Sequence, residues 1–230
     1  PETIVTLATP VGMRPSRTAR VLCGTAAAGI LLLGGCAADP GSPAPTSTPS
    51  APAAPLGAAP PAPPEQEVIG GGTVIETDGS VELCLGPVME SFPPQCAGIP
   101  VKGWSWDGLE GAESSGSVTW GAFAVTGTYD GEEFTVVAEP MSLALFDPMA
   151  WPDPTGGRTG ATDDVTLSGI QDELAGRLGD DGAHYLSSST ERGYVWVDVV
   201  WDDGTLQKAA DAEFGEDVVV IRPALRVLEG

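Results

Sequence analysis

The sequence predicts an α+β protein, with a small β-barrel or sandwich in its first half and a small α/β sandwich in its second. Two Asp-Gly dipeptides between alternating apolar segments predict hairpins within residues 66–145. Helical spacing replaces the two-residue period in residues 162–230. Proline and glycine are frequent in residues 146–161, which predicts a loop linker between a β-rich half and an α/β half.

The β-rich half is expected to contain two hairpins, with turns at residues 78–79 and 130–131. Asp-Gly suits a two-residue turn because both positions tolerate a positive φ. The flanking strands are expected at residues 73–77, 80–84, 120–129 and 132–137. Short strands with regular turn signals are typical of sandwiches and of small barrels, including the five-stranded oligomer-binding type.

The α/β half is expected to open with a helix. Residues 168–171 read as a capping box, and Ile170, Leu174 and Leu178 recur at helical spacing before Gly179 ends the element.

A strand over residues 194–201 should follow, with Asp198 on one face beside Tyr194 and Trp196. The opposite, apolar face is expected to consist of Val195, Val197, Val199 and Trp201. Residues 205–214 predict a second helix and residues 218–221 a final strand, so the helices should cover one face of a small sheet.

The charge balance excludes one class of partner. The chain has 10 Lys+Arg against 32 Asp+Glu, a formal net charge of -22. A field of that sign repels phosphate backbones, so nucleic-acid binding is not expected. The charge suits solubility outside the cell, and a surface for cations or a basic partner is the alternative interpretation.

Cysteine usage points to an oxidising compartment. Cys84 and Cys96 are the two cysteines of the globular part, and they are expected to form one disulfide. A zinc site is the alternative, but two thiolates would need further ligands and His184 is the sole histidine. No cofactor or metal is expected.

The N-terminus has the layout of an export signal. Three arginines after Met13 precede a fifteen-residue apolar stretch, residues 21–35, which is shorter than a membrane span. Leu33 to Cys36 resembles the lipobox of bacterial lipoproteins, which implies cleavage before Cys36 and a diacylglyceryl group on its thiol. Residues 1–35 are therefore expected to comprise an upstream extension and a lipoprotein signal. An ordinary secretory signal is the alternative.

Residues 36–65 are expected to be a lipid-anchored, Pro/Ala-rich disordered tether. Residues 37–64 hold ten of the chain's 22 prolines and almost no residue suited to a core. Such a tether would hold the folded part beyond the membrane.

The mature chain resembles uncharacterised, lipobox-bearing secreted lipoproteins of high-GC Gram-positive (actinobacterial) bacteria. The residues that carry the likeness are the lipobox at 33–36, Cys84-Leu-Gly-Pro, Pro93-Pro94-Gln95-Cys96, Trp104-Ser-Trp106, Trp120-Gly121 and the ending at 214–226. The resemblance implies a lipid anchor in the cell membrane, with the domain on the extracytoplasmic face, and it implies no activity.

Two kinds of side chain are candidates for a functional site. Trp104, Trp106, Trp120 and Trp151 lie near expected loops or strand ends, where they could line a binding groove, although packing accounts for them equally. A hydrolase with paired carboxylates would use Asp198 with Asp202 and Asp203, but Asp202-Asp203-Gly204 also reads as the turn before a helix. His184 has no partner motif for nucleophilic catalysis.

These observations favour a non-enzymatic envelope module that contacts cell-wall polymer or another exported protein. An envelope hydrolase is the first alternative, and a surface protein without a dedicated ligand is the second.

Overall fold

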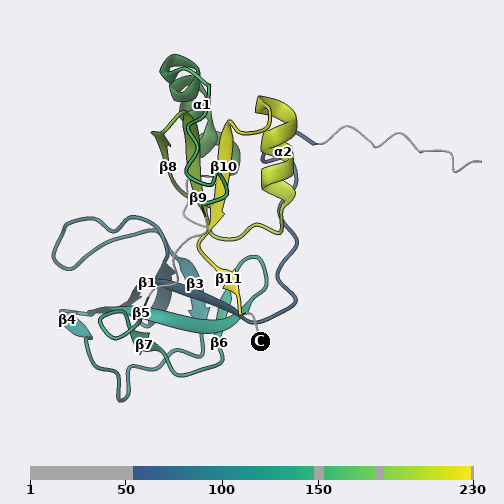
Figure 1. Cartoon of the computed structure of the whole chain (residues 1–230). Helices are drawn as coiled ribbons and strands as arrows, with labels where there is room; N and C mark the ends of the chain where they lie inside the picture. Colours follow the sequence, from purple (N-terminus) through teal and green to yellow (C-terminus); the bar gives the residue numbers. More distant parts are fainter. Residues whose placement is uncertain (1–53, 148–152, 180–183, 229–230) are drawn as a thin grey trace, which may run out of the picture. The chain divides into compact units, whose positions relative to one another are not determined.

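The computed structural model describes residues 54–147, 153–179 and 184–228 (Figure 1). It contains a five-stranded mixed β-barrel followed by a small α/β region with two helices, which confirms the predicted fold class. Of the two architectures expected for the first half, the barrel is the one observed.

The barrel is closed by its first strand, which pairs with two others. The five strands are β1 (Val68–Thr77), β2 (Ser80–Cys84), β3 (Ile99–Lys102), β5 (Val118–Tyr129) and β6 (Phe134–Val136). β1 pairs antiparallel with β2 and β5, and β3 joins β6 in parallel. The short strands β4 (Glu113–Ser115), β7 (Met141–Ser142) and β11 (Arg226–Val227) extend the sheet at β5 and β1.

Apolar side chains of all five strands fill the barrel. The fully buried members include Val68, Val74, Leu83, Ile99, Phe123, Val125 and Phe134. Gly127 allows β5 and β6 to approach closely, because a Cβ atom there would lie 2.2 Å from the carbonyl oxygen of Thr135.

The two predicted hairpins are present, but their turns differ. Asp78 and Gly79 both have a positive φ and connect β1 to β2 in two residues, as expected. The turn between β5 and β6 was expected at 130–131 and instead spans 130–133. The Asp130 carboxylate accepts the backbone N–H groups of Glu132 and Glu133, which stabilises the longer loop.

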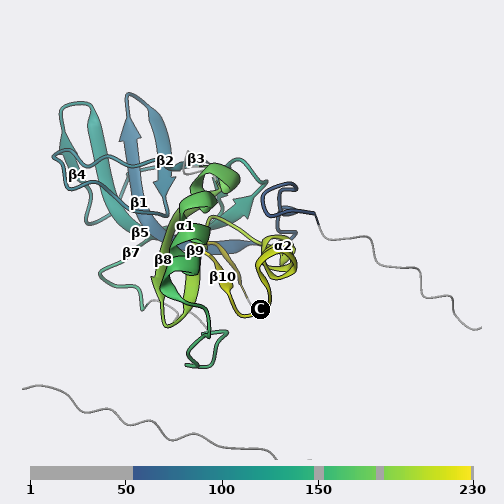
Figure 2. The ribbon, with the colours of Figure 1, turned by 90° about the horizontal axis from the view of Figure 1, so that it is seen from above.

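In the α/β region, two helices cover one face of a three-stranded sheet. The strands are β8 (Tyr185–Glu191), β9 (Tyr194–Val199) and β10 (Val219–Pro223), and the helices are α1 (Asp164–Leu178) and α2 (Thr205–Phe214). β9 is central, antiparallel to β8 and parallel to β10. Leucines of both helices pack on Val195, Val197 and Val199, as the alternation predicted. Figure 2 shows both helices beside these strands.

Two details of the α/β region differ from expectation. Helix α1 begins at Asp164 rather than at Ser168, because the Asp163 carboxylate accepts the N–H groups of Val165 and Thr166 and takes the capping role. Trp201 does not share the face of Val199. Strand β9 ends at Val199, so the alternation stops there, and Trp201 packs against the barrel core instead.

Residues that follow β9 and β10 also contribute to the barrel. Val200 and Leu225 are buried in the barrel core, and β11 pairs with β1 at Val68 and Ile69. The segment after β10 therefore leaves the three-stranded sheet and enters the barrel sheet.

Residues 54–64, which we call the strap, pack on the folded part, although the tether was expected to be disordered as far as residue 65. Leu56 is only 3% exposed and belongs to the core of the α/β region. Its backbone N–H donates to Glu213, whose carboxylate is also bound by Arg177. The buried Leu56 side chain and the hydrogen bond of its backbone thus anchor a proline-rich segment.

Candidate binding cleft

A cleft of about 460 Å³ is lined by residues of β1, β8, β9, β10 and β11 and of adjoining loops. Its apolar lining includes Ile69, Leu85, Leu143, Phe146 and Leu186. Gly70 and Gly71 supply bare backbone on β1. A cleft of this size, in which apolar side chains and a few convergent polar groups share the wall, has the properties of a small-molecule site.

A polar row crosses the three-stranded sheet and lines the cleft. Ser187 on β8 and Arg222 on β10 both lie opposite Asp198 on β9. Arg222 donates to the Asp198 carboxylate from Nε at 2.8 Å and from Nη2 at 2.9 Å, and the Ser187 hydroxyl donates to it at 2.9 Å. A bidentate pair of this kind fixes both side chains.

An aromatic ring holds Arg222 from a second direction. The guanidinium carbon of Arg222 lies 5.2 Å from the centre of the Trp196 ring, and Arg192 contacts the same ring at 5.1 Å. Trp196 is itself fixed by a hydrogen bond from Nε1 to the carbonyl oxygen of Glu191. The cation-π contact and the ion pair together preorganise the Arg222 side chain.

The cleft has the opposite charge to the rest of the chain. Residues 54–230 contain seven Lys or Arg, and two of them, Arg222 and Arg226, line the cleft. Among the described lining residues Asp198 is the one carboxylate. Arg222 is the penultimate residue of β10 and Arg226 is the first residue of β11, so the two arginines flank the crossover into the barrel sheet.

The three candidate carboxylates of a hydrolase have different structural roles. Asp198 is bound by Arg222 and Ser187, as described above. Asp202 accepts the N–H groups of Leu206 and Gln207 at the start of α2, and burial raises its pKa. Asp203 accepts the N–H of Thr205, and hydrogen bonds, chiefly from Thr205, lower the pKa of Asp203. Two of the three carboxylates are therefore occupied in capping a helix.

The described candidate tryptophans lie in packed positions. Trp104 and Trp106 contact each other and Phe123, with ring centres 5.1 to 6.1 Å apart. The indole N–H of Trp106 donates to Glu76, whereas that of Trp104 is buried without a hydrogen-bond partner among the described residues. Trp120 packs with Ile75 and Cys84 in a separate cluster and meets the edge of Phe92. Trp151 lies outside the described residues.

The predicted disulfide between Cys84 and Cys96 is present, with a Cα separation of 6.1 Å. A disulfide indicates an extracytoplasmic protein. Cys36, the predicted lipidation site, lies outside the described residues. Within the described ranges no three His, Cys, Asp or Glu side chains are grouped as a metal site requires. The helices of that part of the chain are too short or too polar to cross a membrane.

Comparison of the chain with family models, with curated proteins and with solved structures finds no match in any of the three.

The sequence interpretation named Asp198 but missed the groups around it. Ser187, Arg222 and Arg226 come from three strands, and only the pairing of β8, β9 and β10 brings Ser187 and Arg222 to Asp198. A usable signal existed: in a chain with so few cations, Arg222 and Arg226 stand four positions apart around Pro223.

Proposed function

We propose that the protein is a lipid-anchored protein of the extracytoplasmic envelope and that it acts as a non-enzymatic binding module. Its ligand site is the cleft lined by Asp198, Arg222 and Arg226. The disulfide and the lipobox at residues 33–36 both favour this compartment.

The observation that carries the proposal is the reversed charge of the cleft. An acidic protein repels anions in general, so two arginines against the single carboxylate of Asp198 at one concave site favour an anionic ligand there. Arginine is suited to this role because its planar guanidinium binds carboxylate and phosphate groups in two-point contacts. The apolar wall would contact the remainder of such a ligand, as carried by cell-wall polymer or by an acidic segment of another exported protein.

The geometry favours binding over hydrolysis. A two-carboxylate hydrolase needs two acidic side chains across one bond. Asp198 has a bidentate arginine, and Asp202 and Asp203 cap α2. A binding site needs only the fixed charge and shape that the cleft provides.

Titration calorimetry with citrate, inorganic phosphate and solubilised cell-wall fragments tests the proposal on the full chain. Arg226→Gln should weaken binding of the anionic probe about tenfold, the loss expected for one charge-assisted contact. Arg158→Gln is the matched control, because Arg158 is an exposed arginine whose ion-pair partner is Asp217 and it does not line the cleft. Absence of binding by all three probes, or equal losses in both variants, would refute the ligand site.

A further inference from the structure

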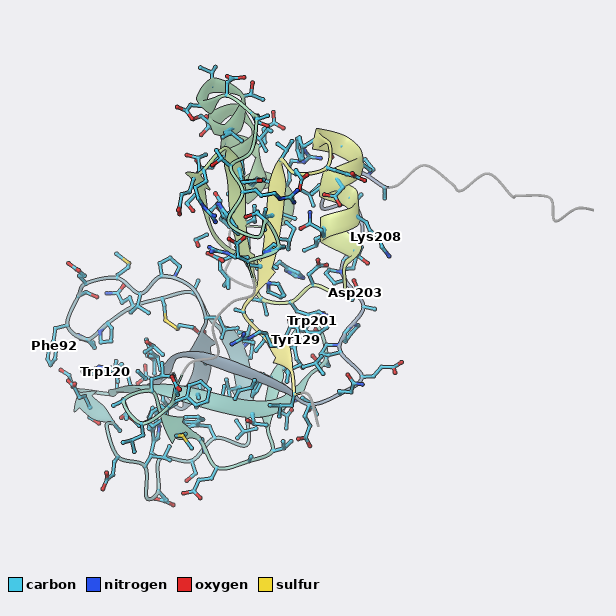
Figure 3. The ribbon with its side chains drawn as sticks, in the orientation of Figure 1. Phe92, Trp120, Tyr129, Trp201, Asp203 and Lys208 are labelled. Atoms are coloured by element: carbon cyan, nitrogen blue, oxygen red, sulfur yellow. A yellow bond between two sulfur atoms is a disulfide. The ribbon has the colours of Figure 1, made fainter. Side chains whose placement is uncertain are left out.

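The strap makes a second, separate contact beyond Leu56. Its proline-rich end, residues 59–64, reads Ala-Pro-Pro-Ala-Pro-Pro. Figure 3 labels Tyr129, Trp201 and Asp203, the side chains that concern this contact. Proline fixes φ near -65°, and the residue before a proline is also extended, so this sequence is preset for polyproline II.

Both backbone polar groups of Ala62 are bound by side chains. The indole N–H of Trp201 donates to the Ala62 carbonyl oxygen at 2.8 Å. The Ala62 N–H donates to Oδ2 of Asp203 at 3.2 Å. Polyproline II has no internal hydrogen bonds, so its backbone groups are free for such contacts.

Burial along the strap repeats every three residues. Pro61 and Pro64 are half-buried, whereas Pro60, Ala62 and Pro63 are exposed. Polyproline II has three residues per turn, so positions i and i+3 share one face. The half-burial of Pro61 and Pro64 fits a polyproline helix that lies with one edge on the folded part.

The surface beneath the strap is aromatic and incompletely filled. A cavity of about 320 Å³ remains between the strap prolines and a wall that includes Tyr129, His184 and Trp201. Aromatic grooves with a tryptophan donor are a recurring means of recognising proline-rich segments. The unfilled volume shows that the resident segment does not exhaust the space in this groove.

The groove is acidic at one end. Asp130 and Glu132 line it beside Pro63. Lys208 contributes to a small cavity at the other end of the strap, with Pro55 and Ala59. The strap brings no cation to the acidic end, because the residues that follow its prolines are Glu65, Gln66 and Glu67. The resident segment is thus matched to the groove in shape but not in charge.

We propose that Tyr129, Trp201 and Asp203 form a recognition groove for polyproline helices, that the strap occupies it within the molecule, and that its preferred occupant is a proline-rich segment of another exported protein followed by lysine or arginine. This site is distinct from the cleft lined by Asp198, Arg222 and Arg226, and the proposal does not depend on that cleft. Leu56 holds the strap in the α/β core independently, so the Ala-Pro-Pro-Ala-Pro-Pro end can leave the groove while the strap stays attached.

An added peptide has to compete with the strap for the groove. A segment tethered next to its own site has an effective concentration of the order of millimolar, so an added peptide binds the intact protein only weakly. The full chain with Pro61→Ser and Pro64→Ser should have an open groove. The full chain with Pro60→Ser and Pro63→Ser loses the same number of prolines, but at exposed positions, and is the matched control.

The probes are two synthetic peptides: AAPPAPPEQE, which copies residues 58–67, and AAPPAPPKQK, in which lysine replaces both glutamates. Binding is measured by tryptophan fluorescence and calorimetry. The lysine peptide should bind the Pro61/Pro64 variant at least about tenfold more tightly than the control variant. It should also bind severalfold more tightly than the glutamate peptide, with an advantage that falls as salt rises.

Two tryptophan variants locate the contact. In the chain with Pro61→Ser and Pro64→Ser, Trp201→Phe should weaken binding of the lysine peptide about tenfold. The aromatic ring stays, but the N–H donor to the peptide carbonyl is lost. Trp106→Phe likewise loses an indole hydrogen bond, but its acceptor is the Glu76 carboxylate outside the groove, so this variant should leave binding unchanged. Equal binding to the two proline variants, or equal effects of the two tryptophan variants, would overturn the proposal.

Amide exchange in the unaltered chain provides a readout that needs no strap variant. Excess lysine peptide should displace the strap and speed exchange of the Ala62 N–H, which is bonded to Asp203. The backbone N–H of Leu56, bonded to Glu213, should keep its protection. Unchanged Ala62 exchange at saturating peptide would also count against binding in the groove.

Discussion

Arg222 and Asp198 lie opposite each other on parallel strands and form a bidentate ion pair, with hydrogen bonds of 2.8 and 2.9 Å. Both side chains are 30% exposed. Replacing Arg222 by Gln should lower the free energy of unfolding by about 1–2 kcal/mol, since it leaves a half-buried carboxylate without its cation. In urea unfolding, Asp198→Asn combined with Arg222→Gln should cost less than the sum of the single changes. Simple additivity would show that the pair is not coupled.

Substitution of Leu56 tests whether the strap contributes to the stability of the fold. Leu56→Ala should lower the free energy of unfolding by about 2–3 kcal/mol, because it removes a side chain that is 3% exposed in the α/β core. Leu145→Ala is the control, since Leu145 is 76% exposed and should change stability by less than about 0.5 kcal/mol. Equal effects in chemical denaturation would mean that residues 54–64 do not pack on the domain.

The disulfide fixes the loop between β2 and β3, residues 85–98, against the barrel. Replacing both Cys84 and Cys96 by Ala should lower the free energy of unfolding by roughly 3 kcal/mol, mainly because the unfolded chain gains freedom. Thermal unfolding of the double variant measures the loss. Non-reducing mass spectrometry of exported protein is the complementary check, and free thiols in that sample would contradict the assignment.

Tyr129 should make stability fall at alkaline pH. Burial, followed by the charges of Asp130 and Glu132, raises the pKa of Tyr129 to about 12. The pKa of Tyr129 in the folded state lies above the ordinary value of 10.0. The neutral phenol therefore contributes to the free energy of unfolding fully below pH 10, and this contribution is lost as the pH rises toward 12. Absorbance titration should show a phenol that ionises near pH 12 and is missing in Tyr129→Phe. A variant with the same alkaline unfolding curve as the parent would exclude this origin.

We expect attachment to the membrane to depend on Cys36. Cys36→Ala should release the protein from the membrane fraction or leave the signal uncleaved, because the acylated thiol is the proposed anchor. Fractionation with metabolic palmitate labelling measures both effects. Labelled membrane protein in unchanged amount would remove the lipoprotein part of the proposal.

Local signals predicted the elements that local interactions determine. The turn at Asp78-Gly79 and the helix that ends before Gly215 follow from residues adjacent in the chain, and both are present where expected. The start of α1 was placed too late because Asp163 and Ser168 are both good capping residues, and only the core position of Leu167 requires the earlier start.

Contacts between distant residues could not be obtained in the same way. Periodicity assigned Trp201 to the face of Val199, but it could not reveal that the strand ends before Trp201. Composition indicated a free tether, and it gave no weight to one leucine among prolines and alanines. The polar row at Asp198 depends on strand order and register, neither of which is encoded in any single segment.

The pairing of Val68 with Val227 joins the first barrel strand to nearly the last described residues. Synthesis proceeds from the N-terminus, so β11, which covers this edge of β1, is made after every other described strand. Until then Val68 and Ile69 keep an open backbone edge, which is a template for pairing with other chains. A chain that lacks β11 would keep that edge exposed and would tend to aggregate, so Arg226 and Val227 protect the barrel against edge-to-edge pairing with other chains.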